Sequence, residues 1–222
     1  MMYIKKYKKT YCINGCELFN DDSNYLYWEN RNATKDEVEI VNFLNFRYFD
    51  KKISVLHIGI GNSYVASNLK IFEKILGITI SNNEINFAKT LKVNNYQSYF
   101  FNKLEKNVFS GEKFSKYDVI IDVNIKSFCC CEGSFNKLFS DYHKMLNSNG
   151  ILVTGKKGMN WSRTVRPVIR FSIKKLFYKR LKEFDGPDSN ILSIEECKKL
   201  AKNHNLELNE IDNTNIVTFT KF

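Results

Sequence analysis

The sequence predicts an α/β fold: a doubly wound, seven-stranded sheet that is mostly parallel and ends in an antiparallel C-terminal hairpin. Three observations support this prediction. Short apolar runs alternate with helical patterns along the chain, the first run ends in glycines, and the last two runs alternate apolar and polar residues. The chain has 222 residues and 43% hydrophobic content, which suits one domain with its own core.

Seven segments have the composition of strands. The first five are short, mostly β-branched runs, typical of strands that are buried on both faces of a parallel sheet. The last two flank Asn213-Thr214-Asn215, which has the composition of a turn. The predicted strands are 53–58, 74–80, 98–101, 117–122, 150–154, 207–211 and 216–220.

Helical patterns fill the intervals between these strands. Thr34 with Glu37, and Ser193 with Glu196, have the spacing of capping boxes, which mark the first turn of a helix. The other helices are indicated by apolar residues at helical spacing. The predicted helices are 34–48, 64–71, 83–94, 135–146 and 193–203.

The chain is predicted to be a single domain, 1–222, because it contains only two prolines and no linker-like stretch. We expect residues 1–50 to form an N-terminal cap segment and residues 156–190 a basic helical insertion. Between 156 and 182 the sequence has ten basic residues and no acidic one, which can account for the net charge of +10. This segment suits an anionic small molecule, nucleic acid or a membrane surface, or is simply a solvated helix face.

The remaining composition bears on location and on metals. No apolar run follows the basic start or is long enough to cross a membrane, so we expect a cytoplasmic protein. Three of the six cysteines are adjacent, which favours free thiols over a disulfide framework. Cys12 and Cys16 have a loose metal-ligand spacing, but no second pair of zinc-finger spacing follows, so we expect no metal site.

A glycine-rich turn follows the first predicted strand. Gly59-Ile60-Gly61 lies between that strand and a predicted helix. Glycine lets the backbone approach a ligand closely, and the start of a helix offers free N–H groups. Because ligands of doubly wound sheets bind outside the carboxyl ends of the strands, this position predicts a ligand-binding loop.

Four segments, in order, resemble the motifs of the class I S-adenosylmethionine-dependent methyltransferases, whose sheet is Rossmann-like. Val55–Ser63 resembles V-L-D-[IV]-G-x-G-x-G, and Gly77–Ser81 resembles G-[IV]-D-[IL]-S. Phe114–Asp122 is similar to the F-D-x-[IV] strand, and Lys144–Val153 to L-K-P-G-G-x-L-[VI]. The second segment is also similar to G-[VL]-T-[LI]-S-x-x-Q of the cyclopropane fatty acid synthases.

The resemblance implies S-adenosyl-L-methionine as the cofactor. Thr79 stands where the family has a ribose-binding acid, and Glu84 either takes that role or is an ordinary helix-start carboxylate. His57 replaces another acid; it could be neutral, cationic or a satisfied strand-end residue. The residues assigned to the cofactor are His57, Gly59, Ile60, Gly61, Asn62, Ser63, Thr79, Ile80, Glu84, Asn102, Asp122 and Val123.

No catalytic signature of the N-P-P-[YF] type follows the fourth strand. Methyl transfer from a sulfonium depends on positioning and needs a base only if the acceptor must lose a proton. Asp122, Tyr25 and His143 are the candidate bases, although Tyr25 and His143 are also explained as packing or surface residues. The run Cys129-Cys130-Cys131 could line the pocket, supply a nucleophile or consist of small buried hydrophobes.

These features together predict an S-adenosylmethionine-dependent methyltransferase that acts on a small-molecule or lipid-like acceptor. One alternative is an RNA or protein methyltransferase that uses the basic segment. Another is an enzyme that uses a related sulfonium, such as an aminopropyl transferase or a lyase. A non-catalytic adenosyl-binding module is a third, favoured by His57 and Thr79.

Overall fold

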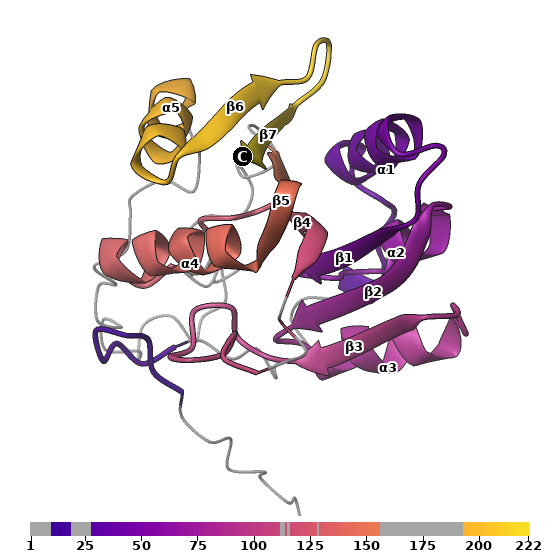
Figure 1. Ribbon diagram of the computed structural model, residues 1–222. Coiled ribbons are helices and arrows are strands. Elements are labelled where there is room, and N and C mark those ends of the chain that lie inside the picture. Colours follow the sequence, from indigo (N-terminus) through magenta and orange to yellow (C-terminus); the bar gives the residue numbers. More distant parts are fainter. Residues whose placement is uncertain (1–9, 19–27, 112–113, 115, 128, 156–192) are drawn as a thin grey trace, which may run out of the picture.

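The computed structural model describes residues 10–18, 28–111, 114, 116–127, 129–155 and 193–222. Its seven strands form one sheet in the order β3-β2-β1-β4-β5-β7-β6, which confirms the predicted fold (Figure 1). Pairings from β3 to β5 are parallel, and β7 is antiparallel to both β5 and β6. The strands are β1 Ile53–Ile58, β2 Phe72–Thr79, β3 Tyr96–Phe100, β4 Tyr117–Asp122, β5 Leu146–Gly155, β6 Leu206–Glu210 and β7 Ile216–Lys221.

Both predicted capping boxes are present. The Thr34 hydroxyl accepts the Glu37 N–H at 3.2 Å, and the Glu37 carboxylate accepts the Thr34 N–H at 2.8 Å. Ser193 and Glu196 make the same reciprocal bonds at 3.2 and 2.8 Å. These boxes satisfy N–H groups that a helix start otherwise leaves unpaired. The helices are η1 Trp28–Asn30, α1 Lys35–Arg47, α2 Tyr64–Asn68, α3 Asn82–Thr90, α4 Glu132–Met145 and α5 Ile194–Asn203.

Two helices end earlier than the sequence predicts. The helix predicted over 64–71 ends at Asn68, because Leu69 is extended with φ −76° and ψ 120°. The amide of Asn45 in α1 donates to the Asn68 carbonyl at 3.2 Å, which satisfies an acceptor at the helix end. α3 also ends early, and Lys92 just beyond it has a left-handed φ of 49°.

Helices cover both faces of the sheet, as the doubly wound prediction requires (Figure 1). On one face, Leu44 of α1 and Val65 of α2 share a buried cluster with Val55 of β1. On the other face, Leu138 of α4 and side chains of α5 share a second cluster with Leu56. Successive residues of a strand point to opposite faces, so β1 contributes alternately to the two clusters.

The predicted basic insertion 156–190, with its charged stretch 156–182, lies outside the described residues. Within the described parts of the chain, no helix combines the length and apolar character needed to traverse a lipid bilayer.

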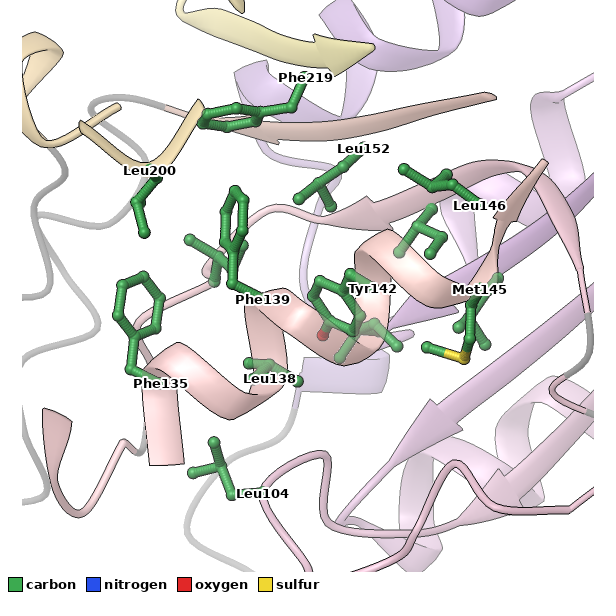
Figure 2. Close-up of a cluster of buried hydrophobic side chains, with 14 of the residues drawn as sticks. Leu104, Phe135, Leu138, Phe139, Tyr142, Met145, Leu146, Leu152, Leu200 and Phe219 are labelled. Carbon is green, nitrogen blue, oxygen red and sulfur yellow. The ribbon is translucent and has the colours of Figure 1, made fainter. Parts of the chain in front are cut away.

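Phe139 is central to the cluster under α4. Its side chain is fully buried and meets Phe219 of β7 edge to face, with ring centroids 5.0 Å apart (Figure 2). We expect Phe139→Ala to lower the free energy of unfolding by about 3–5 kcal/mol, because it removes a large buried ring and leaves a cavity. Urea denaturation followed by circular dichroism measures this loss.

The matched control is Phe46→Ala in α1, because the Phe46 side chain is 83% exposed. We expect this variant to stay within about 0.5 kcal/mol of the parent protein. Equal losses in the two variants would contradict the placement of Phe139 in the core.

Candidate functional site

The glycine turn lies at the carboxyl end of β1. Its φ values are 73° at Gly59, 50° at Gly61 and 56° at Ser63, all in the left-handed region that residues with a Cβ disfavour. The Ser63 N–H closes the turn by donating to the Ile60 carbonyl at 2.7 Å. Among the described residues, no atom lies within 4 Å of a Cβ placed on Gly59, so none of them fills the space beside this part of the turn.

Glu84 fastens this turn to the end of β2. Its Oε2 accepts the Gly61 N–H at 3.0 Å and the Thr79 hydroxyl at 2.6 Å. The side chain is buried, and burial raises the pKa of its carboxyl while the bonds from Thr79 and Gly61 lower it. Glu84 is therefore more than a solvent-facing helix-start carboxylate, because it joins the two loops that the sequence assigned to the cofactor.

Arg31 is a residue of this site that the sequence analysis missed. Its guanidinium donates to both carboxylate oxygens of Glu37 at 2.6 Å. The amide of Asn62 donates to the Arg31 carbonyl at 2.8 Å, and a Cβ on Gly61 would lie 2.7 Å from Arg31 Nη2. Burial would raise the pKa of Glu37, but the bonds and the charge of Arg31 lower it. The capping-box spacing of Thr34 and Glu37 predicts only that Glu37 caps a helix. No sequence pattern predicts the ion pair between Glu37 and Arg31.

His57 is fully buried on the face of β1 that α1 covers. Among the described residues neither ring nitrogen has a hydrogen-bond partner, so His57 is not a satisfied strand-end residue. Burial lowers its pKa to about 4, against the opposing effects of Glu37 and Asp122. Of the alternatives that the sequence left open, the structure supports a neutral imidazole near neutral pH.

Asp122 ends β4 and is held by two donors. Its Oδ2 accepts from Lys103 Nζ and from the Tyr142 hydroxyl, each at 2.8 Å. The same Lys103 ammonium donates to the carbonyls of Asn124 and Ile125 at 2.8 and 3.0 Å. Asp122 thus anchors the loop after β4, and its charge is compensated by Lys103.

Other predicted cofactor residues border the same edge. The Asn102 carboxamide, buried after β3, accepts the Leu104 N–H at 3.0 Å and so shapes its own turn. The Val123 carbonyl accepts the Gly155 N–H at 3.4 Å and ties β4 to the end of β5. Ile80, directly after β2, is half-buried. Ser63 pairs its hydroxyl with that of Tyr96 at 2.9 Å.

The structure places His143 at the opposite edge of the sheet. α4 runs back along the sheet and ends at Met145, and the next residue, Leu146, pairs with Tyr117 at the start of β4. The candidate base His143, in the last turn of α4, is therefore remote from the turn that begins at Gly59. Tyr25, the remaining candidate base, lies outside the described residues.

The buried His57 predicts a specific pH dependence of stability. A pKa of about 4, below the ordinary 6.5, means that the unfolded chain binds more protons between these values. The contribution of the neutral His57 to the free energy of unfolding is fully present above about pH 6.5 and is lost as the pH falls to about 4. The shift corresponds to about 3 kcal/mol.

Urea denaturation at several pH values between 7 and 4 measures this contribution. We expect the free energy of unfolding of His57→Leu to fall by about 3 kcal/mol less than that of the parent protein over that range. His143→Gln changes a partly exposed histidine whose pKa burial also lowers, so it should depart from the parent in the same direction but by much less. Identical pH profiles for His57→Leu and the parent would refute the neutral, buried imidazole.

Solved structures with this fold include several methyltransferases. The N-methyltransferase NodS from Bradyrhizobium japonicum WM9, in complex with S-adenosyl-L-homocysteine, is similar with a TM-score of 0.57 and 14% identity over 91% of this chain and 93% of that one. Magnesium protoporphyrin IX methyltransferase from Synechocystis PCC 6803, with the same bound ligand, gives 0.55 and 15% over 84% and 82%. The [4+2]-cyclase SpnF gives 0.51 and 12% over 78% and 57%.

Sequence comparison adds no closer relationship. A scan against protein-family models finds no match, and a search of curated proteins finds none either. The similarity therefore lies in the fold, and its sheet order and helical layers agree with those expected from the sequence motifs. The chain has the fold of the class I methyltransferases.

Proposed function

We propose that this protein is an S-adenosylmethionine-dependent methyltransferase that acts on a small-molecule or lipid-like acceptor. The observation that carries the proposal is the left-handed turn 59–63, which Glu84 holds at the carboxyl edge of the sheet. This is the edge where doubly wound sheets bind ligands. Two proteins with this fold, NodS and magnesium protoporphyrin IX methyltransferase, were solved with S-adenosyl-L-homocysteine, which supports the choice of cofactor.

The turn suits the methionine part of this cofactor. No described residue lies within 4 Å of the position where a side chain on Gly59 would begin, so the described part of the chain leaves room for a ligand close to the Gly59 backbone. Arg31 lies beside Gly61 and brings positive charge to the position proposed for the ligand's carboxylate. A guanidinium has five N–H donors, so Arg31 can keep its ion pair with Glu37 and still attract a second carboxylate.

Glu84 suits the ribose of the cofactor. Both of its bonds to the turn and to Thr79 use Oε2, and we assign the ribose hydroxyls to Oε1. A carboxylate accepts such bonds more strongly than a neutral hydroxyl, so Glu84 compensates for the missing acid at Thr79. A neutral His57 adds no positive charge beneath the turn, which is favourable for a cationic sulfonium.

S-adenosylmethionine supplies an activated methyl group on its sulfonium, so the protein's own task is to bind and orient. The described side chains fit that task better than proton abstraction, because Asp122 is held by Lys103 and Tyr142. This favours an acceptor that needs no strong base. The net charge of +10 further favours an anionic acceptor, such as an acidic small molecule or lipid.

A second candidate is a protein that binds an adenosyl ligand without transferring a methyl group. Two observations favour it: Asp122 is engaged by a cation, and His143 lies at the far edge of the sheet. SpnF, which has this fold and is named a cyclase, shows that the fold serves other reactions. Binding of S-adenosylmethionine without transfer of its labelled methyl group to small-molecule, lipid, RNA or protein pools would favour this candidate.

Calorimetry with S-adenosylmethionine and S-adenosylhomocysteine tests the binding proposal directly. We expect the parent protein to bind both compounds and Gly59→Ala to bind them at least roughly tenfold more weakly, because the new Cβ would project into the space proposed for the ligand. No heat with either compound at high concentration would remove the proposal.

Gly15→Ala provides the matched control for backbone strain. Gly15 has φ 77°, and a Cβ added there, like one on Gly59, would meet no described residue within 4 Å, so both variants carry a similar left-handed penalty of about 1–2 kcal/mol. We expect Gly15→Ala to retain the parent's affinity. Equal affinities in the two variants would show that the ligand does not contact Gly59.

A second prediction concerns Glu84. We expect Glu84→Gln to weaken S-adenosylmethionine binding about tenfold, because a neutral amide accepts the ribose hydroxyls less strongly than a carboxylate of the same size. Glu73→Gln, at an exposed position earlier in β2, serves as the control and should bind as the parent does. An unchanged affinity in folded Glu84→Gln would exclude the ribose assignment while leaving the turn assignment standing.

A further inference from the structure

Four cysteines from two distant parts of the chain lie together outside the site described above. They are Cys12, Cys16, Cys130 and Cys131, and we call them the cysteine cluster. Their sulfur atoms all lie within 4.8 Å of one another, and all four thiols are free. The adenosyl site has no part in this arrangement, so a role for the cluster is independent of the proposed function.

The first pair lies on a tight hairpin. Tyr11 and Glu17 form an antiparallel bridge, and the Cys12 N–H donates to the Cys16 carbonyl at 3.0 Å. Gly15, at φ 77°, makes the turn and donates its N–H to the Cys12 carbonyl at 3.0 Å. The three-residue spacing that seemed loose in the sequence is thus a compact turn that brings both thiols to the cluster.

The second pair immediately precedes α4. Cys131 is the N-cap residue of this helix, and its sulfur accepts the Ser134 N–H at 3.4 Å. The start of a helix favours negative charge, and a thiolate is the form that binds a metal. Adjacent residues are a poor pair for a disulfide, but here their sulfur atoms lie within 4.8 Å of the two sulfur atoms of the hairpin.

Polar hydrogens already point at two of these sulfurs. Asn14 donates its backbone N–H to Cys12 Sγ at 3.3 Å and its side-chain amide to Cys131 Sγ at 3.4 Å. Hydrogen bonds of this kind strengthen when the acceptor sulfur carries negative charge, as a metal-bound thiolate does.

The size and chemistry of the cluster match one tetrahedral ion. Zinc–thiolate bonds of about 2.3 Å place four sulfurs about 3.8 Å apart, so the cluster would contract by no more than about 1 Å. All the donors grouped here among the described residues are thiols, which are soft ligands that favour zinc over magnesium or calcium. Four protein ligands leave no open position, which is the pattern of structural rather than catalytic zinc.

We propose that the cysteine cluster binds one zinc ion in a closed, structural tetrathiolate site. The ion fixes the hairpin 10–18 against the first turn of α4. This hairpin also receives the Lys106 N–H at the Tyr11 carbonyl, at 3.1 Å, from the segment between β3 and β4. In Figure 1 the indigo hairpin accordingly lies beside that pink segment and apart from α1.

Metal analysis of the full chain, purified under reducing conditions, tests this proposal. We expect one zinc ion per chain in the parent protein, and far less than one in Cys16→Ser and Cys131→Ser. Cys197→Ser, at a buried cysteine of α5 outside the cluster, is the control and should retain zinc. Loss of zinc in Cys197→Ser to the same extent, or a parent protein that holds none, would count against the site.

Cobalt substitution supplies a readout that does not depend on the variants. We expect the metal-free parent to take up one Co²⁺ and show the intense visible bands of tetrahedral thiolate coordination, which zinc then removes. We also expect chelation to lower the melting temperature and zinc, but not magnesium, to restore it. An octahedral cobalt spectrum, no uptake, or a disulfide within the cluster under reducing conditions would overturn the proposal.

Discussion

The parallel pairing of β1 with both β2 and β4 is the constraint on which the candidate site depends. Ile58, the last residue of β1, is in register with Ile78 on one side and with Asp122 on the other. The three strands therefore end at one edge of the sheet. The chain leaves β3 on one side of β1 and resumes at β4 on the other, which is the reversal where loops separate and ligands bind. The glycine turn stands at this point because β1 leads directly into it.

Buried charges at this edge are balanced by partners from other elements. Arg31, before α1, neutralises Glu37, and Lys103, after β3, neutralises Asp122. A buried charge without a partner is costly, so each pair also fixes the segments that carry it. Glu84 differs because the bonds to its Oε2 come from a backbone N–H and a hydroxyl, which are neutral donors. Burial raises the pKa of Glu84, so further hydrogen bonds to its carboxylate would stabilise the charged form.

Local patterns predicted the fold well, and contacts between distant segments account for what those patterns miss. The bounds of β1 and β4 and both capping boxes follow from short stretches of sequence, because a buried strand and a helix start depend on their own residues. The ion pair of Arg31 with Glu37 joins a loop to a helix, and no periodicity encodes it. The position of His143 was predictable, since a helix between parallel strands must run back, and its last turn lies far from the carboxyl edge.

Of the three adjacent cysteines, Cys129 belongs to the core alone, whereas Cys130 and Cys131 contact the core and also belong to the cysteine cluster. Cys129 packs in the core, where burial raises its pKa to about 12, so it behaves as the small hydrophobe that sequence analysis allowed. The next two residues of the run belong to the cysteine cluster and open α4. In its last turns the same helix carries Tyr142, whose hydroxyl donates to Asp122 at the end of β4. An ion at the first turn of α4 would therefore hold the helix that supports the loop after β4.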